Sequence, residues 1–250
     1  MNNQQGKKAE PSTFTHKQAV EIALSDPAAR IMVNRSPLVA ERNRLYEESA
    51  HELLADLAAA GYGGIEKVGD LRRRGTADYR AAVPILLEWL PRVSYLMLSE
   101  DIVRTLSVSF AKRLAAPEFL RLFRDPPHLE DPLRPATSEP PKEHLRWIIG
   151  NGLSIFAEPF LADELIELSL DRRFGHARYQ IVSALPKTKD KKVAGILMGL
   201  LDDPTVRAAA IDALGKMKFT PARTSIETLL EDPDKNIRDQ AKKALKRIDN

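Results

Sequence analysis

The chain has 250 residues, of which 43% are hydrophobic, so it can bury a sizeable core and most of it is not disordered. Its 38 Lys and Arg residues nearly balance its 35 Asp and Glu residues, and the net charge of +3 argues against the concentrated positive charge of a typical nucleic-acid-binding protein. The absence of cysteine excludes disulfides and thiolate metal sites.

The N-terminal third does not match the pattern of the rest of the chain. Residues 1–12 are polar and lack the apolar core of a secretory signal, so we expect a disordered tail on a cytoplasmic protein without a membrane span. Residues 13–80 are predicted to form a helical capping region, with one helix over 17–24 and a long one from Pro37 to about Ala60. This region would cover the apolar end of the first repeat.

Residues 81–250 are predicted to form an array of helix pairs. Five arginines each precede small or apolar residues by six or seven positions, and successive arginines are 42, 32, 29 and 31 residues apart. Such a period indicates a helical repeat. The arginines are Arg104, Arg146, Arg178, Arg207 and Arg238. The expected helices cover 83–90, 101–114, 144–157, 162–170, 175–187, 191–201, 204–217, 221–230 and 233–248.

The first interval between arginines is about ten residues longer than the others, and the excess falls at 125–141. This segment has prolines at 126, 127, 132, 135, 140 and 141, which exclude a helix. We therefore expect a projecting loop between the two helices of one repeat, and we favour a mobile surface insertion over a binding element.

Helix starts follow a recurring pattern in the C-terminal part. Asp203, Thr220 and Asp232 each precede a proline, which combines an N-cap residue with the residue best tolerated at the first helical position. The small residues around Gly152 fall where a repeat helix needs close packing, so we interpret them as packing residues rather than a phosphate site.

Two segments carry a family resemblance. LLDDPTVRAAAIDALGKMK and LLEDPDKNIRDQAKKALKRI resemble HEAT repeats of the short bacterial type found in bilin-lyase (PBS-lyase) proteins. The resemblance is strong over 160–250 and weaker over 81–157. It implies an all-α fold: an α-solenoid in which antiparallel helix pairs stack into a right-handed superhelix. It also implies that the second helix of each pair lines a concave surface, which in this family commonly binds a partner.

The arginine row has two readings. It can be a structural ladder in which each arginine pairs with an acidic residue or carbonyl of a neighbouring repeat, and Asp101, Glu143, Asp203 and Asp234 are the candidate partners. The other reading is a row that faces a ligand. We favour the ladder, but a ladder on the concave wall can also expose one edge. The candidate partner-binding residues are Arg104, Arg146, Trp147, Arg178, Tyr179, Arg207 and Arg238.

A second row stands nine residues after the arginines, about 180° further round each helix. It consists of Arg113, Ile155, Lys187, Lys216 and Arg247. Cations near helix C-termini are favoured by the helix dipole, so we favour capping and solubility for this row. The alternative is a surface that binds nucleic acid, including a protein similar to alkylpurine DNA glycosylases, with Lys187, Lys216, Lys242 and Arg247 as the binding residues.

The sequence contains no recognisable catalytic motif. HExxH, P-loop and GxSxG patterns are absent, and the five histidines are scattered. Paired carboxylates such as Asp202 and Asp203 begin helices, where negative charge is favourable without catalysis. We therefore lean towards a non-enzymatic scaffold or adaptor that binds a protein or peptide, with no cofactor and no metal.

Overall fold

The computed structural model describes residues 37–74 and 79–250. The expected tail over 1–12 and the expected helix over 17–24 lie outside these residues. The chain divides into two compact units at Tyr46, and each unit is described by itself. The described part of the first unit is the beginning of helix α3 (Pro37–Leu57), where Arg44 pairs with Glu41.

The segment from Tyr46 to Arg74 contains the rest of α3 and two short helical turns. The long helix predicted from Pro37 is confirmed, and it continues as a π-helical turn, η1 (Ala58–Tyr62). Gly61 ends this turn with φ of +93°, a left-handed conformation that glycine adopts without strain. The 3₁₀ turn η2 (Val68–Arg74) buries Val68 and Leu71 and packs against α5.

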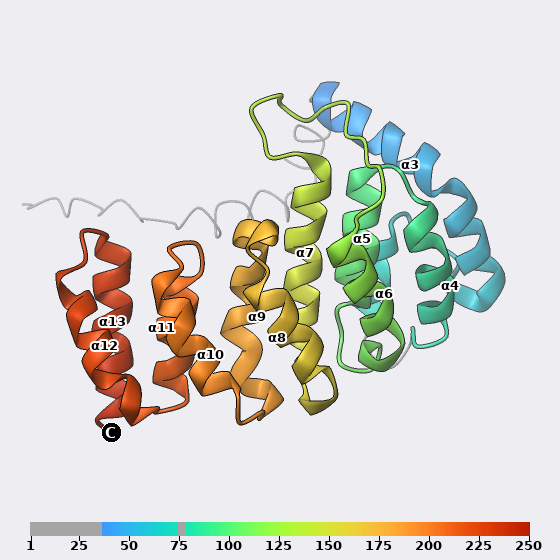
Figure 1. Ribbon diagram of the computed structural model, residues 1–250. Helices are drawn as coiled ribbons and strands as arrows, with labels where there is room; N and C mark the ends of the chain where they lie inside the picture. Colours follow the sequence, from blue (N-terminus) through green and yellow to red (C-terminus); the bar gives the residue numbers. More distant parts are fainter. Residues whose placement is uncertain (1–36, 75–78) are drawn as a thin grey trace, which may run out of the picture. The chain divides into compact units, whose positions relative to one another are not determined.

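Five helix pairs follow in the described part of the chain. Figure 1 shows the helices from α8 to α13 lying one after another in chain order. The all-α solenoid predicted from the sequence is confirmed. We call the members of each pair the first and the second helix. The pairs are α4 (Ala82–Trp89) and α5 (Leu96–Leu106), α6 (Lys112–Arg124) and α7 (Pro141–Phe156), α8 (Ala162–Leu170) and α9 (Tyr179–Ala184), α10 (Val193–Gly199) and α11 (Arg207–Lys216), and α12 (Arg223–Thr228) and α13 (Lys235–Ile248).

Short 3₁₀ segments adjoin half of these helices. They are η3 (Leu90–Arg92), η4 (Pro159–Leu161), η5 (Arg172–Arg178), η6 (Leu185–Thr188), η7 (Leu200–Asp202), η8 (Thr220–Ala222) and η9 (Leu229–Glu231). None of the helices in the described ranges is long and apolar enough to span a membrane.

The second helices pack against one another in the order α5, α7, α9, α11 and α13. Small residues make this contact close. A Cβ atom added at Gly215 of α11 would lie 2.7 Å from the Cα of Ala244 in α13, and one added at Gly150 of α7 would lie 2.7 Å from the carbonyl oxygen of Ala177. One added at Gly152 would clash with Phe119, so the packing role predicted for the small residues around Gly152 is consistent with the structure.

The helix predicted over 101–114 is wrong. Helix α5 ends at Leu106, and residues 107–111 separate it from α6. Arg104 therefore lies in the last turn of α5 rather than near the beginning of a second helix. Helix α6 was missed because Pro117 stands in its interior, where proline is usually a helix breaker.

The proline-rich segment lies between α6 and α7, as its spacing predicted, and contains no helix. Its middle is bonded to the residues that precede α5. The Leu96 N–H donates to the carbonyl of Glu130 at 2.9 Å, and the Glu130 N–H donates to the carbonyl of Ser94 at 2.8 Å. Leu129 is buried beside this connection. The insertion is therefore tied to the start of the preceding second helix.

Candidate interaction surface

Arg178 is a buried connection between two repeats. Only 1% of its side chain is exposed, and its Nη2 pairs with Oδ2 of Asp203 at 2.9 Å. Its other nitrogens donate to the carbonyls of Ser169 and Gly175, both at 3.0 Å. Burial acts to raise the pKa of Asp203, but hydrogen bonds from Arg178 and from the Thr205 N–H outweigh it, and the pKa lies below its usual value.

Arg207 repeats this arrangement one repeat later. Its Nη1 pairs with Oδ2 of Asp232 at 3.0 Å, and its Nε donates to the carbonyl of Leu201 at 2.7 Å. Each aspartate stands 25 residues after its arginine and also accepts a backbone N–H two residues further on, at 3.0 Å for Asp203 and 2.8 Å for Asp232. The aspartate therefore fixes the turn before a second helix and holds the arginine of the preceding repeat.

These two pairs support the ladder reading, with two corrections. The partner of Arg207 is Asp232, whereas Asp234 caps α13 by accepting the Asn236 N–H. The predicted helix starts also shift: α11 begins at Arg207 rather than at Pro204, and the described chain has no capping bond from the Thr220 side chain.

The ladder does not extend to Arg146. Its Nε donates to the carbonyl of Phe123 at 2.8 Å, and its Nη1 pairs with Glu143 of the same helix. Asp171 occupies the place of Asp203 and Asp232, 25 residues after Arg146, but it pairs with Arg173 at 2.6 Å. A hydrogen bond from Arg173, opposed by partial burial, lowers the pKa of Asp171.

The remaining two arginines also lack an aspartate of the next repeat. Arg238 donates to the carbonyls of Asp232 and Pro233, at 2.7 and 2.8 Å. Arg104 is 49% exposed and pairs with Glu100 of its own helix at 2.5 Å. Ser99 takes the arginine position in α5, because it precedes four buried residues by the same intervals as Arg207 does; these are Ile102, Val103, Thr105 and Leu106.

Four of the seven candidate partner-binding residues form two contrasting pairs. Arg146 and Arg178 are buried and occupied by internal bonds. Trp147 and Tyr179, which directly follow them, are partly exposed. Because one residue turns an α-helix by about 100°, the neighbour of a buried arginine points away from the packed side.

We call the exposed side of the second helices the second-helix face. It carries three partly or fully exposed positions of α7 at intervals of four residues, Trp147, Asn151 and Ile155. The equivalent positions of the next repeat are Tyr179, Ser183 and Lys187. The side chain of Ile155 is 49% exposed.

A groove of about 370 Å³ lies on this face between α5 and α7, and we call it the α5–α7 groove. Its lining combines apolar side chains, small residues and polar donors. The lining residues are Arg72, Arg104, Ser107, Ile148, Asn151, Gly152 and Ile155.

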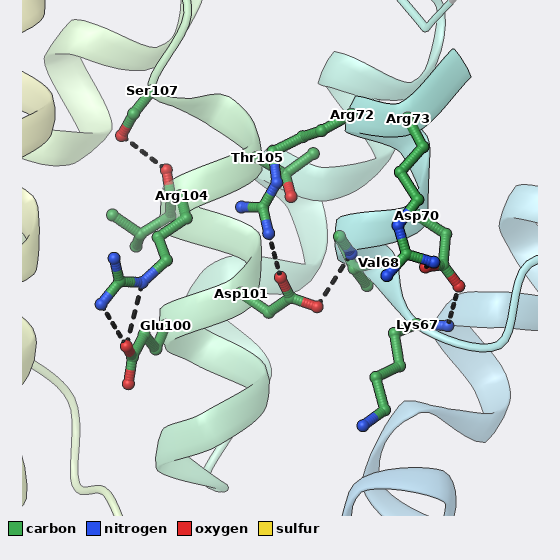
Figure 2. Close-up of polar contacts among 12 residues, drawn as sticks. Lys67, Val68, Asp70, Arg72, Arg73, Glu100, Asp101, Arg104, Thr105 and Ser107 are labelled. Carbon is green, nitrogen blue, oxygen red and sulfur yellow. Dashed lines mark hydrogen bonds and ion pairs between the residues drawn. The ribbon is translucent and has the colours of Figure 1, made fainter. Parts of the chain in front are cut away.

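Arg72 reaches this groove from η2, outside the repeats. Asp101 of α5 holds η2 in place: it accepts the Tyr46 hydroxyl at 2.7 Å, the Gly69 N–H at 2.8 Å and Arg72 at 3.2 Å. Figure 2 shows Asp101 pointing towards Arg72, while Glu100 and Arg104 pair separately on the same helix. Burial and the charge of Asp101 raise the pKa of the Tyr46 hydroxyl, which stays a donor. Asp101 is thus not a partner of the arginine row.

Three members of the basic row form internal bonds at the ends of second helices. Arg113 instead lies near the start of α6, a first helix, so its predicted place at the end of a second helix is wrong. Lys187 donates to the carbonyl of Ser154 at 3.0 Å, and Lys216 and Arg247 both bond to Asp212 at 2.7 Å. Burial opposes the effect, but these two cations keep the pKa of Asp212 below its usual value. Lys242 is exposed on α13. These contacts fit the predicted capping and solubility role.

The stack of paired helices defines an α-solenoid, and the comparisons with known proteins identify its repeat. Residues 162–246 match the family model of HEAT repeats. The chain therefore contains HEAT repeats, from α8 to most of α13, in the segment where the resemblance was strongest. Neither a curated protein nor a solved structure matches the chain. The assignment to the short bacterial type remains a prediction.

Proposed function

We propose that this repeat array is a non-enzymatic scaffold that binds a protein or peptide partner on its second-helix face, with the α5–α7 groove as the main contact. The observation that carries the proposal is the composition of that groove. It places the exposed side chain of Ile155 beside the hydrogen-bond donors of Arg72, Arg104 and Asn151. An apolar contact surrounded by oriented donors is the usual composition of a peptide-binding surface.

The residues next to the groove favour the same function. Trp147 and Tyr179 continue the face with partly exposed aromatic side chains, a residue type enriched where proteins bind each other. HEAT repeats commonly mediate protein interactions, which agrees with this reading. Handedness of the superhelix and concavity of this face remain expectations from the resemblance.

Nucleic-acid binding is the alternative, with Lys187, Lys216, Lys242 and Arg247 as the contacts. Lys216 and Arg247 share the carboxylate of Asp212, and Lys187 donates to the carbonyl of Ser154, so three of the four side chains are engaged in internal contacts. No feature of the described residues favours a glycosylase-like activity in particular. Binding to nucleic acid would weaken steeply with rising salt, whereas binding through an apolar groove would not.

The test is photo-crosslinking followed by titration. A photoreactive phenylalanine analogue replaces Asn151 in the groove, and crosslinked proteins from a nuclease-treated lysate of the source cells are identified by mass spectrometry. The purified partner is then titrated with wild type, Ile155→Glu and Leu170→Glu. Leu170 is the matched control because it is 50% exposed and lies on a first helix.

We expect Ile155→Glu to weaken binding at least tenfold, or about 1.4 kcal/mol, and Leu170→Glu to leave it unchanged. Circular dichroism checks that both variants are folded. Equal binding by wild type and Ile155→Glu would refute the groove as the contact. A crosslink that is formed only without nuclease, with binding that falls steeply in salt, would favour the alternative.

A further inference from the structure

A second groove lies on the first helices, between α6 and the segment formed by η4 and α8. Its volume is about 760 Å³, and it shares no lining residue with the α5–α7 groove. We call it the first-helix groove. Its apolar lining consists of Ala116, Pro117, Leu120, Phe160 and Leu161. Phe160 is 43% exposed, so water covers part of a large aromatic ring here.

One cation of this groove has no carboxylate partner. The guanidinium carbon of Arg113 lies 4.8 Å from the centre of the Phe160 ring, and Arg113 forms no ion pair with any residue in 37–74 or 79–250. A guanidinium stacked on an aromatic ring is held in orientation and loses part of its hydration, yet the N–H groups on its edge stay available. Arg113 is therefore prepared to donate two parallel hydrogen bonds to a carboxylate.

The other arginines of the groove are neutralised. Arg121 pairs with Glu118 at 2.7 Å, and this hydrogen bond together with the charge of Asp125 raises its pKa. Arg124 pairs with Glu164 and, at 3.2 Å, with Glu167. Arg113 is therefore the one arginine of the groove without a carboxylate partner among the described residues. Because Asp125 also lines the groove, the site fits one carboxylate placed on Arg113 better than a polyanion.

Pro117 adds a backbone acceptor to the same place. Proline has no N–H, so it cannot donate to the carbonyl of Arg113 as a residue four positions later in a helix normally does. The carbonyl of Arg113 therefore lacks its usual intrahelical donor.

We propose that the first-helix groove binds an acidic peptide segment of a protein partner, with an apolar side chain between Leu120 and Phe160 and an Asp or Glu carboxylate on Arg113. This site is separate from the second-helix face and does not depend on its function. It would allow the scaffold to hold two partners at once.

The probes are fluorescein-labelled nine-residue peptides that place one Leu and one Glu at separations of one to four residues in a Gly-Ser background. Matched peptides carry Gln in place of Glu, or Ser in place of Leu. Anisotropy titrations use the full chain. We expect at least one Leu-Glu peptide to bind with Kd below roughly 1 mM, and both matched peptides to bind at least fivefold more weakly.

The variants separate this groove from the rest of the molecule. Arg113→Gln and Phe160→Ser are expected to weaken the peptide at least fivefold. Arg223→Gln, on α12 and outside the groove, and Ile155→Glu, on the other face, are expected to leave it unchanged. Arg113→Glu is expected to regain binding to a peptide that carries Lys in place of Glu, a rescue that a misfolded variant cannot give.

Failure of every Leu-Glu peptide to bind would overturn the proposal. So would equal binding of the Gln peptide, or equal binding by Arg113→Gln. Loss of the peptide with Ile155→Glu would place it on the second-helix face and would also overturn the proposal. None of these results bears on the partner captured at Asn151, so the two sites are tested independently.

Discussion

Between α9 and α13, buried or partly buried arginine–aspartate pairs connect one repeat to the next, whereas the equivalent position of α7 bonds differently. Arg178 and Arg207 each reach an aspartate 25 residues later. Arg146 instead pairs with Glu143 of its own helix, and α5 has Ser99 at this position. The C-terminal repeats are thus joined by a periodic arginine–aspartate contact that α5 and α7 lack. In the N-terminal region Arg124 instead joins α6 to α8 through Glu164 and Glu167.

The N-terminal and C-terminal repeats also differ in the grooves on their surfaces. Both grooves described above lie between α5 and α8, where the periodic pairs are absent. There, Arg72 and Arg104 line a groove on the second helices, and Arg113 lines one on the first helices. Both proposed binding sites therefore lie in the N-terminal repeats, where arginines line surface grooves in place of the periodic arginine–aspartate pairs.

The largest expected effect is the loss of the buried pair. Arg178→Ala leaves Asp203 and the carbonyl of Ser169 buried without their partner, so we expect a loss of about 3–5 kcal/mol in the free energy of unfolding. Arg104→Ala removes an exposed pair within one helix and is expected to cost no more than about 0.5 kcal/mol. Urea unfolding followed by circular dichroism measures both.

Asp203→Asn is the control for the first variant, because it keeps the shape of the side chain and removes only its charge. A loss of less than 1 kcal/mol for Arg178→Ala would mean that the pair does not join the repeats. A loss for Arg104→Ala as large as that for Arg178→Ala would remove the contrast between the two regions.

The second prediction concerns close packing at a glycine, which occurs in both regions. Gly152 of α7 and Gly215 of α11 both lie where an added Cβ atom would overlap a neighbouring element. We expect Gly152→Ala and Gly215→Ala each to cost about 1–3 kcal/mol in the free energy of unfolding, because the well-packed neighbours must move. Thermal and urea unfolding of the two variants check this.

Gly195→Ala is the matched control for both. Gly195 lies in α10 with no atom within 4 Å of an added Cβ, so alanine is expected to stabilise the protein by about 0.5–1 kcal/mol. If Gly152→Ala were neutral while Gly215→Ala was costly, α7 would pack more loosely against Phe119 of α6 than α11 packs against α13, and the regions would differ in packing as well as in polar contacts.

The sequence predicted the C-terminal repeats well because one residue pattern determines each contact there. The spacing of Arg178 and Arg207 located both the helix pairs and the ladder. The arginine spacing gave a wrong prediction at Arg104, because that arginine pairs with Glu100 of its own helix. Helix α6 was not predicted, because Pro117 is tolerated in an exposed position of that helix. The α5–α7 groove could not be predicted, since Arg72 reaches it from outside the repeats through a contact with Asp101.

The smallest expected effect is a pH dependence that belongs to the C-terminal region. The pKa of Asp203 is lower in the folded protein than in the unfolded chain, so its pairing with Arg178 stabilises the fold fully above the unfolded pKa, about 3.9, and this contribution is lost as the pH falls through the folded value. We therefore expect the difference in free energy of unfolding between wild type and Asp203→Asn to be largest at pH 7 and to shrink below about pH 4.

Urea unfolding at pH 7, 5, 4 and 3 measures this difference, and carboxylates common to both proteins cancel in it. Asp202→Asn is the control, because Asp202 is the exposed neighbour of Asp203 in the same turn. A difference for Asp203→Asn that stays constant down to pH 3 would contradict a carboxylate held ionised by Arg178. If the difference in free energy of unfolding for Asp202→Asn declined in the same way, the pH dependence would come from the general charge of the turn. Arg178 would then stabilise the repeats through its hydrogen bonds to the carbonyls of Ser169 and Gly175.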